Sequence, residues 1–106
     1  MSKNLFVYGT LTFPEIVKAL TGKTFAAKPA TLTDYFVSML PDRPYPGLVK
    51  RDGDIADGQI LCDIDEKSFR RISEWEDDEY VCQDVQAETS DGVMRAKAFV
   101  WRYPPD

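Results

Sequence analysis

The feature that most limits the fold of this chain is an uninterrupted apolar run near its start, Leu5-Phe6-Val7. A strand with apolar side chains at every position suits a place where protein covers both of its faces. We therefore predict a strand over residues 4–8 that is buried on both faces. The chain has 106 residues, which is enough for one hydrophobic core and leaves little room for a second, so we expect one domain over residues 1–106.

A helix signal follows this strand almost at once. Thr12 and Glu15 have the spacing of a capping box, in which two side chains bond backbone N–H groups at a helix start. Gly22 fits a helix stop, because glycine readily takes the left-handed conformation that ends many helices. We predict a helix over about residues 13–20, joined to the strand by the loop Tyr8-Gly9-Thr10-Leu11.

The remaining sequence is dominated by strand patterns. Strands are expected over residues 30–40, 48–50, 58–64, 79–88 and 93–103, and a second helix over about residues 66–76, capped by Asp65. Turns are expected at Pro46-Gly47, Asp52-Gly53 and Ser90-Asp91-Gly92. About six strands with two short flanking helices predict an α+β fold, built as a small mixed or antiparallel β-barrel.

Composition narrows the possible chemistry. The chain contains no histidine, which removes Ser-His-Asp and Cys-His catalysis and most zinc sites. Acid–base chemistry must therefore rest on Asp, Glu, Lys, Tyr, Cys or a cofactor. The two cysteines, Cys62 and Cys82, are too few for a disulfide framework, and we expect free thiols.

Charge and hydropathy bear on partners and location. The net charge of −5, from 18 acidic and 13 basic residues, argues against nucleic acid and anionic membranes as partners. No apolar run approaches the length of a membrane span, and the N-terminus lacks the pattern of a signal peptide. We therefore expect a cytoplasmic protein. The oligomeric state is not readable from the sequence.

The second predicted helix carries an acidic side chain on its apolar face. At about 100° per residue, Phe69 and Ile72 define that face, and Glu76 falls near its middle. Partial burial would raise the pKa of the Glu76 carboxyl, because desolvation disfavours its charged form, and a more basic carboxylate suits a general base near neutral pH. Alternatively, Glu76 lies past the helix and faces water like the acidic residues 77–79. Periodicity alone does not separate these two interpretations.

The first loop also has two interpretations. Gly9 can take a positive φ and lets a ligand approach the backbone, and Thr10 and Leu11 would present N–H groups at the mouth of the first helix. Such a loop can hold a carboxylate or a developing oxyanion, with the Thr10 hydroxyl adding a hydrogen bond. The other interpretation is a plain structural link, because many strand-glycine-helix connections bind nothing.

Four segments of the chain carry a resemblance to a known family. They are Val7-Tyr8-Gly9-Thr10-Leu11, Tyr45-Pro46-Gly47-Leu48, residues 58–64, and residues 69–76 followed by Tyr80. In order and spacing they resemble the gamma-glutamylcyclotransferase-like (AIG2-like) family, with its tyrosine-glycine-threonine/serine-leucine loop, its proline-glycine turn, its glycine-led strand and its helix that ends in an aromatic residue and a glutamate. The resemblance implies a small β-barrel flanked by helices.

The resemblance also implies an activity and its residues. A γ-glutamyl group would cyclise to 5-oxoproline while the attached amine or amino acid leaves. Glu76 matches the family's catalytic glutamate, which would take a proton from the α-amine and return it to the leaving amine. Tyr8, Gly9, Thr10 and Leu11 match the substrate loop, and Tyr80 matches the tyrosine that follows the helix. The implied partner is a small γ-glutamyl compound, and this chemistry requires no metal and no cofactor.

Four positions depart from the family pattern. Ser73 stands where aspartate is frequent, Asp77 where glycine is common and Cys82 where arginine is common, and Thr12 follows the loop where a basic residue is frequent. These changes bear on the substrate more than on the fold. They leave open a second hypothesis, a non-catalytic module that binds a small carboxylate-bearing metabolite in the same pocket. The leaving group stays open between an amino acid, a lysine side chain, a polyamine and part of an antibiotic precursor.

Overall fold

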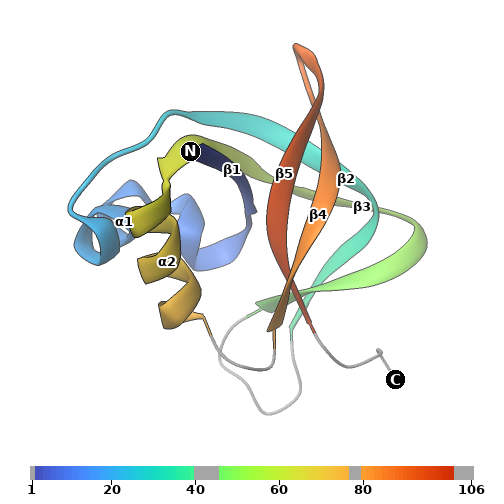
Figure 1. Ribbon diagram of the computed structural model, residues 1–106. Helices are drawn as coiled ribbons and strands as arrows, with labels where there is room; N and C mark the ends of the chain where they lie inside the picture. Colours follow the sequence, from blue (N-terminus) through green and yellow to red (C-terminus); the bar gives the residue numbers. More distant parts are fainter. Residues whose placement is uncertain (1, 40–45, 77–79, 102–106) are drawn as a thin grey trace.

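Five strands and two helices make up the described part of the chain, residues 2–39, 46–76 and 80–101 of a computed structural model (Figure 1). The strands are β1 (Ser2–Val7), β2 (Ala27–Met39), β3 (Pro46–Asp65), β4 (Tyr80–Thr89) and β5 (Gly92–Trp101). The helices are α1 (Pro14–Thr21) and α2 (Glu66–Trp75), and a short 3-10 turn, η1 (Gly9–Thr12), precedes α1. The predicted α+β class is confirmed.

The strands close into a barrel in the order β1-β3-β2-β4-β5. Antiparallel pairing joins β1 to the second half of β3, β2 to β3, and β4 to β5. Two parallel contacts of β5 complete the closure: β1 meets it at Leu5↔Lys97, and β3 meets it at Leu48↔Val100. The side of β5 that carries these two contacts is called the β5 seam below. The barrel is thus mostly antiparallel, and its parallel pairing is confined to this seam.

The two strands expected over residues 48–50 and 58–64 are one continuous strand, β3. The turn expected at Asp52-Gly53 is therefore wrong. The pairing with β2 shifts register beside Asp34, which has a φ of 68°, and Gly53 has a φ of 88°. The Gly53 N–H donates to the Asp34 carboxylate at 3.0 Å. The Asp34 side chain on the neighbouring strand thus provides a hydrogen-bond acceptor for the backbone at this irregularity in β3. The local sequence predicts a turn there because Asp-Gly is common in turns.

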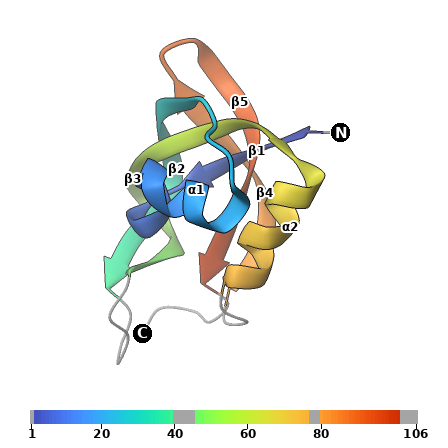
Figure 2. The same ribbon diagram turned by 90° about the vertical axis from the view of Figure 1, so that its left-hand side faces the viewer.

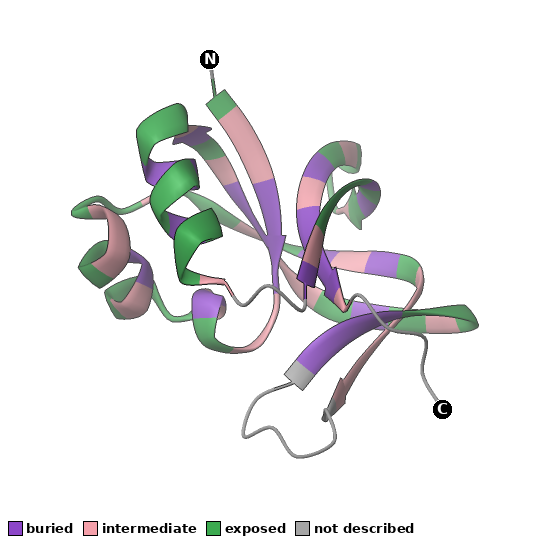
Figure 3. Ribbon diagram, turned by 60° about the horizontal axis from the view of Figure 1, so that its bottom comes forward, coloured by how far each residue is buried: buried purple, intermediate pink, exposed green. Residues whose placement is uncertain are grey.

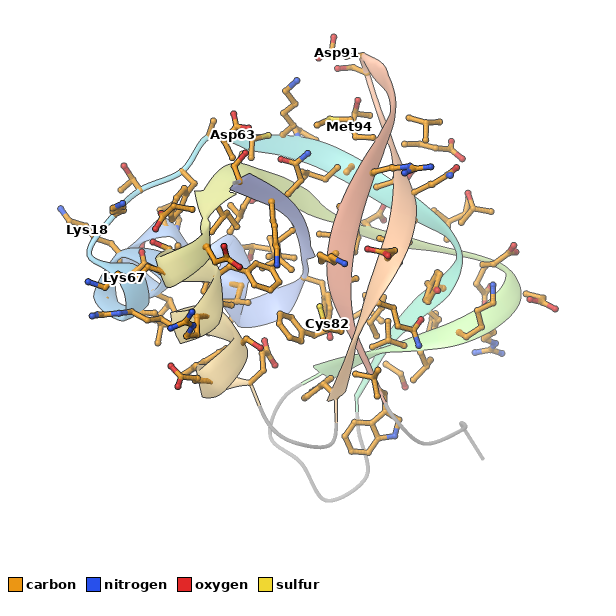
Figure 4. All side chains as sticks on the ribbon, in the orientation of Figure 1. Lys18, Asp63, Lys67, Cys82, Asp91 and Met94 are labelled. Carbon is orange, nitrogen blue, oxygen red and sulfur yellow. The ribbon has the colours of Figure 1, made fainter. Side chains whose placement is uncertain are left out.

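The other two predicted turns had opposite outcomes. Pro46-Gly47 is not the middle of a turn, because both residues pair with the end of β2, and proline is tolerated as the first residue of a strand. Residues 40–45 lie outside the described residues. The turn at Ser90-Asp91-Gly92 is confirmed: β4 ends at Thr89, β5 begins at Gly92, and Asp91 lies at the tip of this hairpin in Figure 4.

Strand β1 is buried on both faces, as its apolar run predicts. Leu5 and Val7 pack between the barrel wall and the helices, and their exposed fractions are 0% and 1%. Phe6, also 1% exposed, belongs to the separate core inside the barrel. Small side chains are frequent in this narrow interior: Ala30, Ala56, Ala87, Ala96 and Ala98. Figure 3 shows the buried residues along the strands and on the inner side of each helix.

Helix α2 begins and packs as its sequence predicts. The Asp65 side chain caps it by accepting a hydrogen bond from the Ser68 N–H at 3.1 Å. Hydrogen bonds from the side chain and the backbone of Ser68, together with Lys23 at 3.3 Å, lower the pKa of Asp65 to about 2. Phe69 and Ile72 are buried against the barrel, with Ile72 fully covered. The exposed Lys67 lies on the outer side of the helix (Figure 4).

Helix α1 starts differently from the prediction. Its N-cap is Phe13, which makes no side-chain capping bond, so the capping box of Thr12 and Glu15 is wrong. The Thr12 hydroxyl instead donates to the Gly9 carbonyl at 2.6 Å, which closes η1 on itself. Gly22 ends the helix with a φ of 78°, as predicted. Helices α1 and α2 lie next to each other on one side of the barrel (Figure 2). Neither described helix is long and apolar enough to cross a membrane.

Candidate functional site

Three of the predicted site residues, Tyr8, Glu76 and Tyr80, lie near the end of the barrel that is lower in Figure 1, called the lower rim below. There β5 ends, β4 begins and α2 ends. Tyr8 is the first residue after β1, and its hydroxyl donates to the Phe99 carbonyl of β5 at 2.7 Å. Tyr8 is therefore tied to a strand that lies 91 positions further along the chain.

Glu76 and Tyr80 both act electrostatically on the Tyr8 phenol. Burial raises the pKa of Tyr8 well above its ordinary value, and the Glu76 carboxylate raises it further, followed by Tyr80. A backbone hydrogen bond from Leu48 acts in the opposite direction, because a donor to the phenol oxygen favours the phenolate. Tyr8 thus shares one local environment with Glu76 and Tyr80, which are both far from it in the sequence.

Glu76 follows neither sequence-based interpretation completely. Helix α2 ends at Trp75, and Glu76 is its C-cap, with φ and ψ of −68° and 146°. Its N–H still donates to the Ile72 carbonyl at 3.1 Å, which fixes its backbone to the last turn. The residue is partly buried, and its charge acts on Tyr8. Glu76 has therefore left the helix, as one interpretation required, but it lies at the rim rather than in open solvent. Residues 77–79 lie outside the described residues.

Tyr80 opens β4 and is 9% exposed. It pairs across the hairpin with Trp101, and the two rings meet edge to face with centroids 5.6 Å apart. Tyr80 also belongs to the core cluster that contains Ile72 and Phe99. Trp101 is partly buried and borders the same rim through its contact with Tyr80.

The loop after β1 is a short 3-10 turn with a buried anchor. Gly9 has a φ of 72°, the positive value expected for it. Leu11 is 5% exposed and packs in the core between barrel and helices, whereas Thr10 is exposed. The Phe13 N–H donates to the Thr10 carbonyl at 3.1 Å, and the Thr12 hydroxyl bond to Gly9 closes the turn. The loop is therefore held in one shape before any ligand arrives.

Sequence reasoning missed two backbone groups of the rim, the Phe99 carbonyl and the Leu48 N–H. No residue type signals them, because every residue carries such groups.

The described residues hold no group of three or more His, Cys, Asp or Glu side chains that could bind a metal ion. Cys62 and Cys82 are both free, as expected. Burial is the largest influence on the Cys82 thiol and raises its pKa.

Comparison with known families gives a clear result. Residues 5–106 match the family described as "Gamma-glutamyl cyclotransferase, AIG2-like". The chain belongs to this family. Among its curated relatives, AIG2-like protein D of Arabidopsis thaliana is 29% identical over 97% of this chain and 70% of its own length. AIG2-like protein C of the same plant is 28% identical, and there the chain spans 61% of the relative's length.

Solved structures of similar fold agree with this family. A solution structure from Arabidopsis thaliana is matched over 100% of this chain and 66% of its own, with a TM-score of 0.90 and 24% identity. An AIG2-like protein from Mus musculus is matched over 98% of this chain and 80% of its own, with a TM-score of 0.81 and 18% identity. A structure titled gamma-glutamyl cyclotransferase is matched over 95% of this chain and 67% of its own, with a TM-score of 0.78 and 16% identity. These likenesses establish the fold that the AIG2-like resemblance predicted.

Proposed function

We propose that this member of the family is a gamma-glutamyl cyclotransferase that acts on a small γ-glutamyl compound. One observation carries the proposal: the Glu76 carboxylate lies close enough to Tyr8 to shift the pKa of its phenol. A candidate proton acceptor and the start of the candidate substrate loop therefore meet at the same rim. In this family such a pair suits an intramolecular acyl transfer.

In the proposed reaction the substrate's own α-amine is the nucleophile. This amine is mostly protonated at neutral pH, and Glu76 accepts its proton. The freed nitrogen attacks the γ-carbonyl carbon, forming the C–N bond of a five-membered ring and a tetrahedral intermediate. Glu76 then donates the proton to the leaving nitrogen as the original amide C–N bond breaks, and the ring nitrogen loses its second proton to the Glu76 carboxylate, which passes it to solvent. The products are 5-oxoproline and a free amine or amino acid, and the proximity of the reacting groups in one substrate lowers the barrier.

The loop of Gly9, Thr10 and Leu11 is proposed to hold the substrate's carboxylate or the oxyanion of the intermediate. Backbone N–H groups at fixed positions stabilise such charge without reorganising during the reaction. The buried Leu11 side chain and the closing bond between Thr12 and Gly9 support this role, because both restrict the loop. Tyr80 is proposed to line the pocket beside Glu76.

The test is a panel of γ-glutamyl amino acids and γ-glutamyl amines assayed for 5-oxoproline release. Glu76→Gln keeps the shape of the side chain and removes the base, so we expect a rate loss of about 10²- to 10⁴-fold, the usual contribution of a positioned acid–base group. Glu74→Gln is the matched control, because Glu74 is exposed near the end of α2, two residues before Glu76, and its variant should retain the wild-type rate.

Two outcomes would contradict parts of this proposal. Equal rates of release by the wild type and Glu76→Gln would remove the assigned role of Glu76. If no member of the panel yields 5-oxoproline while calorimetry still detects binding of γ-glutamyl compounds, the protein is a non-catalytic binding module. Ser73, which stands where the family often has aspartate, is the departure that favours this second function.

A further inference from the structure

Three strands meet where Tyr8 leaves β1. At Leu5, β1 still contacts β5, through the pair Leu5↔Lys97. Two residues later β1 ends, and further along β5 the next contact is with β3, at Leu48↔Val100. The β5 seam therefore changes its partner strand at this point. Tyr8 follows β1 directly into the region between these two contacts.

The Tyr8 side chain reaches both strands of the changeover. Its hydroxyl donates its single proton to the Phe99 carbonyl at 2.7 Å, and the same oxygen accepts the backbone hydrogen bond from Leu48. Phe99 is the residue before Val100 on β5, so both bonds lie beside the pair Leu48↔Val100. The ring packs against the barrel's interior core, with its centroid 6.5 Å from that of Phe6.

We propose that Tyr8 is a positioning residue: its phenol bridges β3 and β5 where β1 ends, and so fixes the start of the Gly9–Thr12 loop. This changes the role that the family resemblance implied for Tyr8, which was direct contact with substrate. The claim that Tyr8 bridges the two strands does not depend on the proposed function. The claim that the loop's order affects catalysis rests on the proposed function.

The bonding pattern explains why this position suits a phenol. A hydroxyl carries one proton, and here the proton goes to Phe99, so Tyr8 has none to offer to a substrate or to Glu76. The raised pKa keeps the phenol protonated at neutral pH, so it does not act as a base. A phenylalanine would fill the same space but would leave the Leu48 N–H and the Phe99 carbonyl without this partner.

The loop is then held at both of its ends. Tyr8 is the N-cap of η1 and has an extended backbone, and the phenol anchors it to β5. At the other end, the Thr12 hydroxyl bonds to the Gly9 carbonyl. Loosening the first anchor should disorder the loop in the free protein. Substrate would have to restore that order, which raises KM more than it lowers kcat.

The experiment compares Tyr8→Phe with Tyr35→Phe, a matched control on β2 whose half-buried ring packs under Lys50. Amide hydrogen exchange is followed by NMR at Leu48 and Val100, with Ile60 of β3 as an internal reference. In Tyr8→Phe we expect exchange at Leu48 to accelerate about tenfold or more, the effect of losing one hydrogen bond, while Ile60 stays unchanged. Tyr35→Phe should leave all three amides within about twofold of the wild type.

Activity provides the second measurement. Tyr8→Phe should raise KM for the best γ-glutamyl substrate severalfold and leave the pH midpoints of kcat/KM unchanged. If the exchange rate at Leu48 is unchanged in Tyr8→Phe, the proposed bridge between β3 and β5 is wrong. If the pH midpoint of kcat/KM shifts in this variant, Tyr8 takes part in proton transfer and is not only a positioning residue. If the wild type releases no 5-oxoproline, the proposed function fails, while hydrogen exchange still decides the bridge.

A measurement on the wild type covers the case in which Tyr8→Phe does not fold. A phenol proton that is bonded to a carbonyl and partly buried exchanges slowly, so a Tyr8 hydroxyl resonance should be observable, with nuclear Overhauser contacts to Phe99 and Val100. Overhauser contacts from this proton to Glu76 in place of Phe99 would overturn the assignment.

Discussion

The substitution Gly58→Ala tests how closely β1 and β3 approach each other. Gly58 lies in β3 beneath the end of β1. A Cβ added there would lie 2.8 Å from Cζ of the Phe6 ring, and closer still to the carbonyl oxygen of Val7. Neither group can yield easily, because Phe6 is 1% exposed inside the barrel and the Val7 backbone belongs to the β1–β3 pairing.

The expected magnitude is a balance of two terms. Alanine in a strand is favoured over glycine by roughly 0.5–1 kcal/mol, because glycine loses more chain entropy on folding. An added carbon in a filled core costs about 1–3 kcal/mol through displaced side chains and backbone. We expect the steric term to prevail and the free energy of unfolding to fall by about 1–2 kcal/mol. With a urea m-value of about 2 kcal/mol/M, in the middle of the usual range, the midpoint falls by roughly 0.5–1 M.

The assay is urea unfolding followed by tryptophan fluorescence, since the chain has two tryptophans. Phe6→Leu removes one of the two obstructing groups, so the double variant Gly58→Ala/Phe6→Leu should be more stable than the sum of the single changes predicts. Gly53→Ala is a control of a different kind, because nothing lies within 4 Å of its added Cβ and its cost comes from a φ of 88° alone. A Gly58→Ala protein as stable as the wild type would refute the steric reasoning.

Three further predictions concern the helix and the titrating groups. Ile72→Ala, which truncates a fully buried side chain, should lower the free energy of unfolding by about 2–5 kcal/mol in the same urea assay, and wild-type stability would contradict the packing of α2. Because the pKa of Asp65 is lowered to about 2, its contribution to stability is present above pH 4 and is lost as the pH falls toward 2. Thermal unfolding should therefore show a smaller loss over that range in Asp65→Asn, which keeps the capping oxygen. Because the pKa of Tyr8 is raised, folding should weaken above about pH 10, where the unfolded chain loses a proton that the folded protein retains, and Tyr8→Phe should weaken less.

Local patterns predicted several features correctly because short-range physics controls them. The apolar run of β1 requires cover on both faces, and the structure provides it. Asp65 caps α2 and Gly22 ends α1, since both act on backbone groups within four residues. The hairpin at Ser90-Asp91-Gly92 likewise depends on turn chemistry between adjacent strands.

The errors arose where another hydrogen-bond partner replaced the expected one. Thr12 has the spacing of a cap but bonds to Gly9, and α1 starts one residue later. Asp52-Gly53 has the composition of a turn, but Asp34 on the facing strand holds Gly53 in a bulge, so β3 continues. In each case two arrangements satisfy the same local preferences, and hydrogen bonds formed in the folded chain select one of them.

The sequence by itself determined which residues could form a site: one acid near the apolar face of α2, and a glycine loop after a buried strand. Periodicity could not decide whether Glu76 faces core or water, because the answer depends on where the helix ends. Only the tertiary structure decided that Glu76 leaves the helix and acts on Tyr8. The partners of Tyr8 are a carbonyl of Phe99 and an N–H of Leu48, groups that every residue carries, so barrel closure alone selects them.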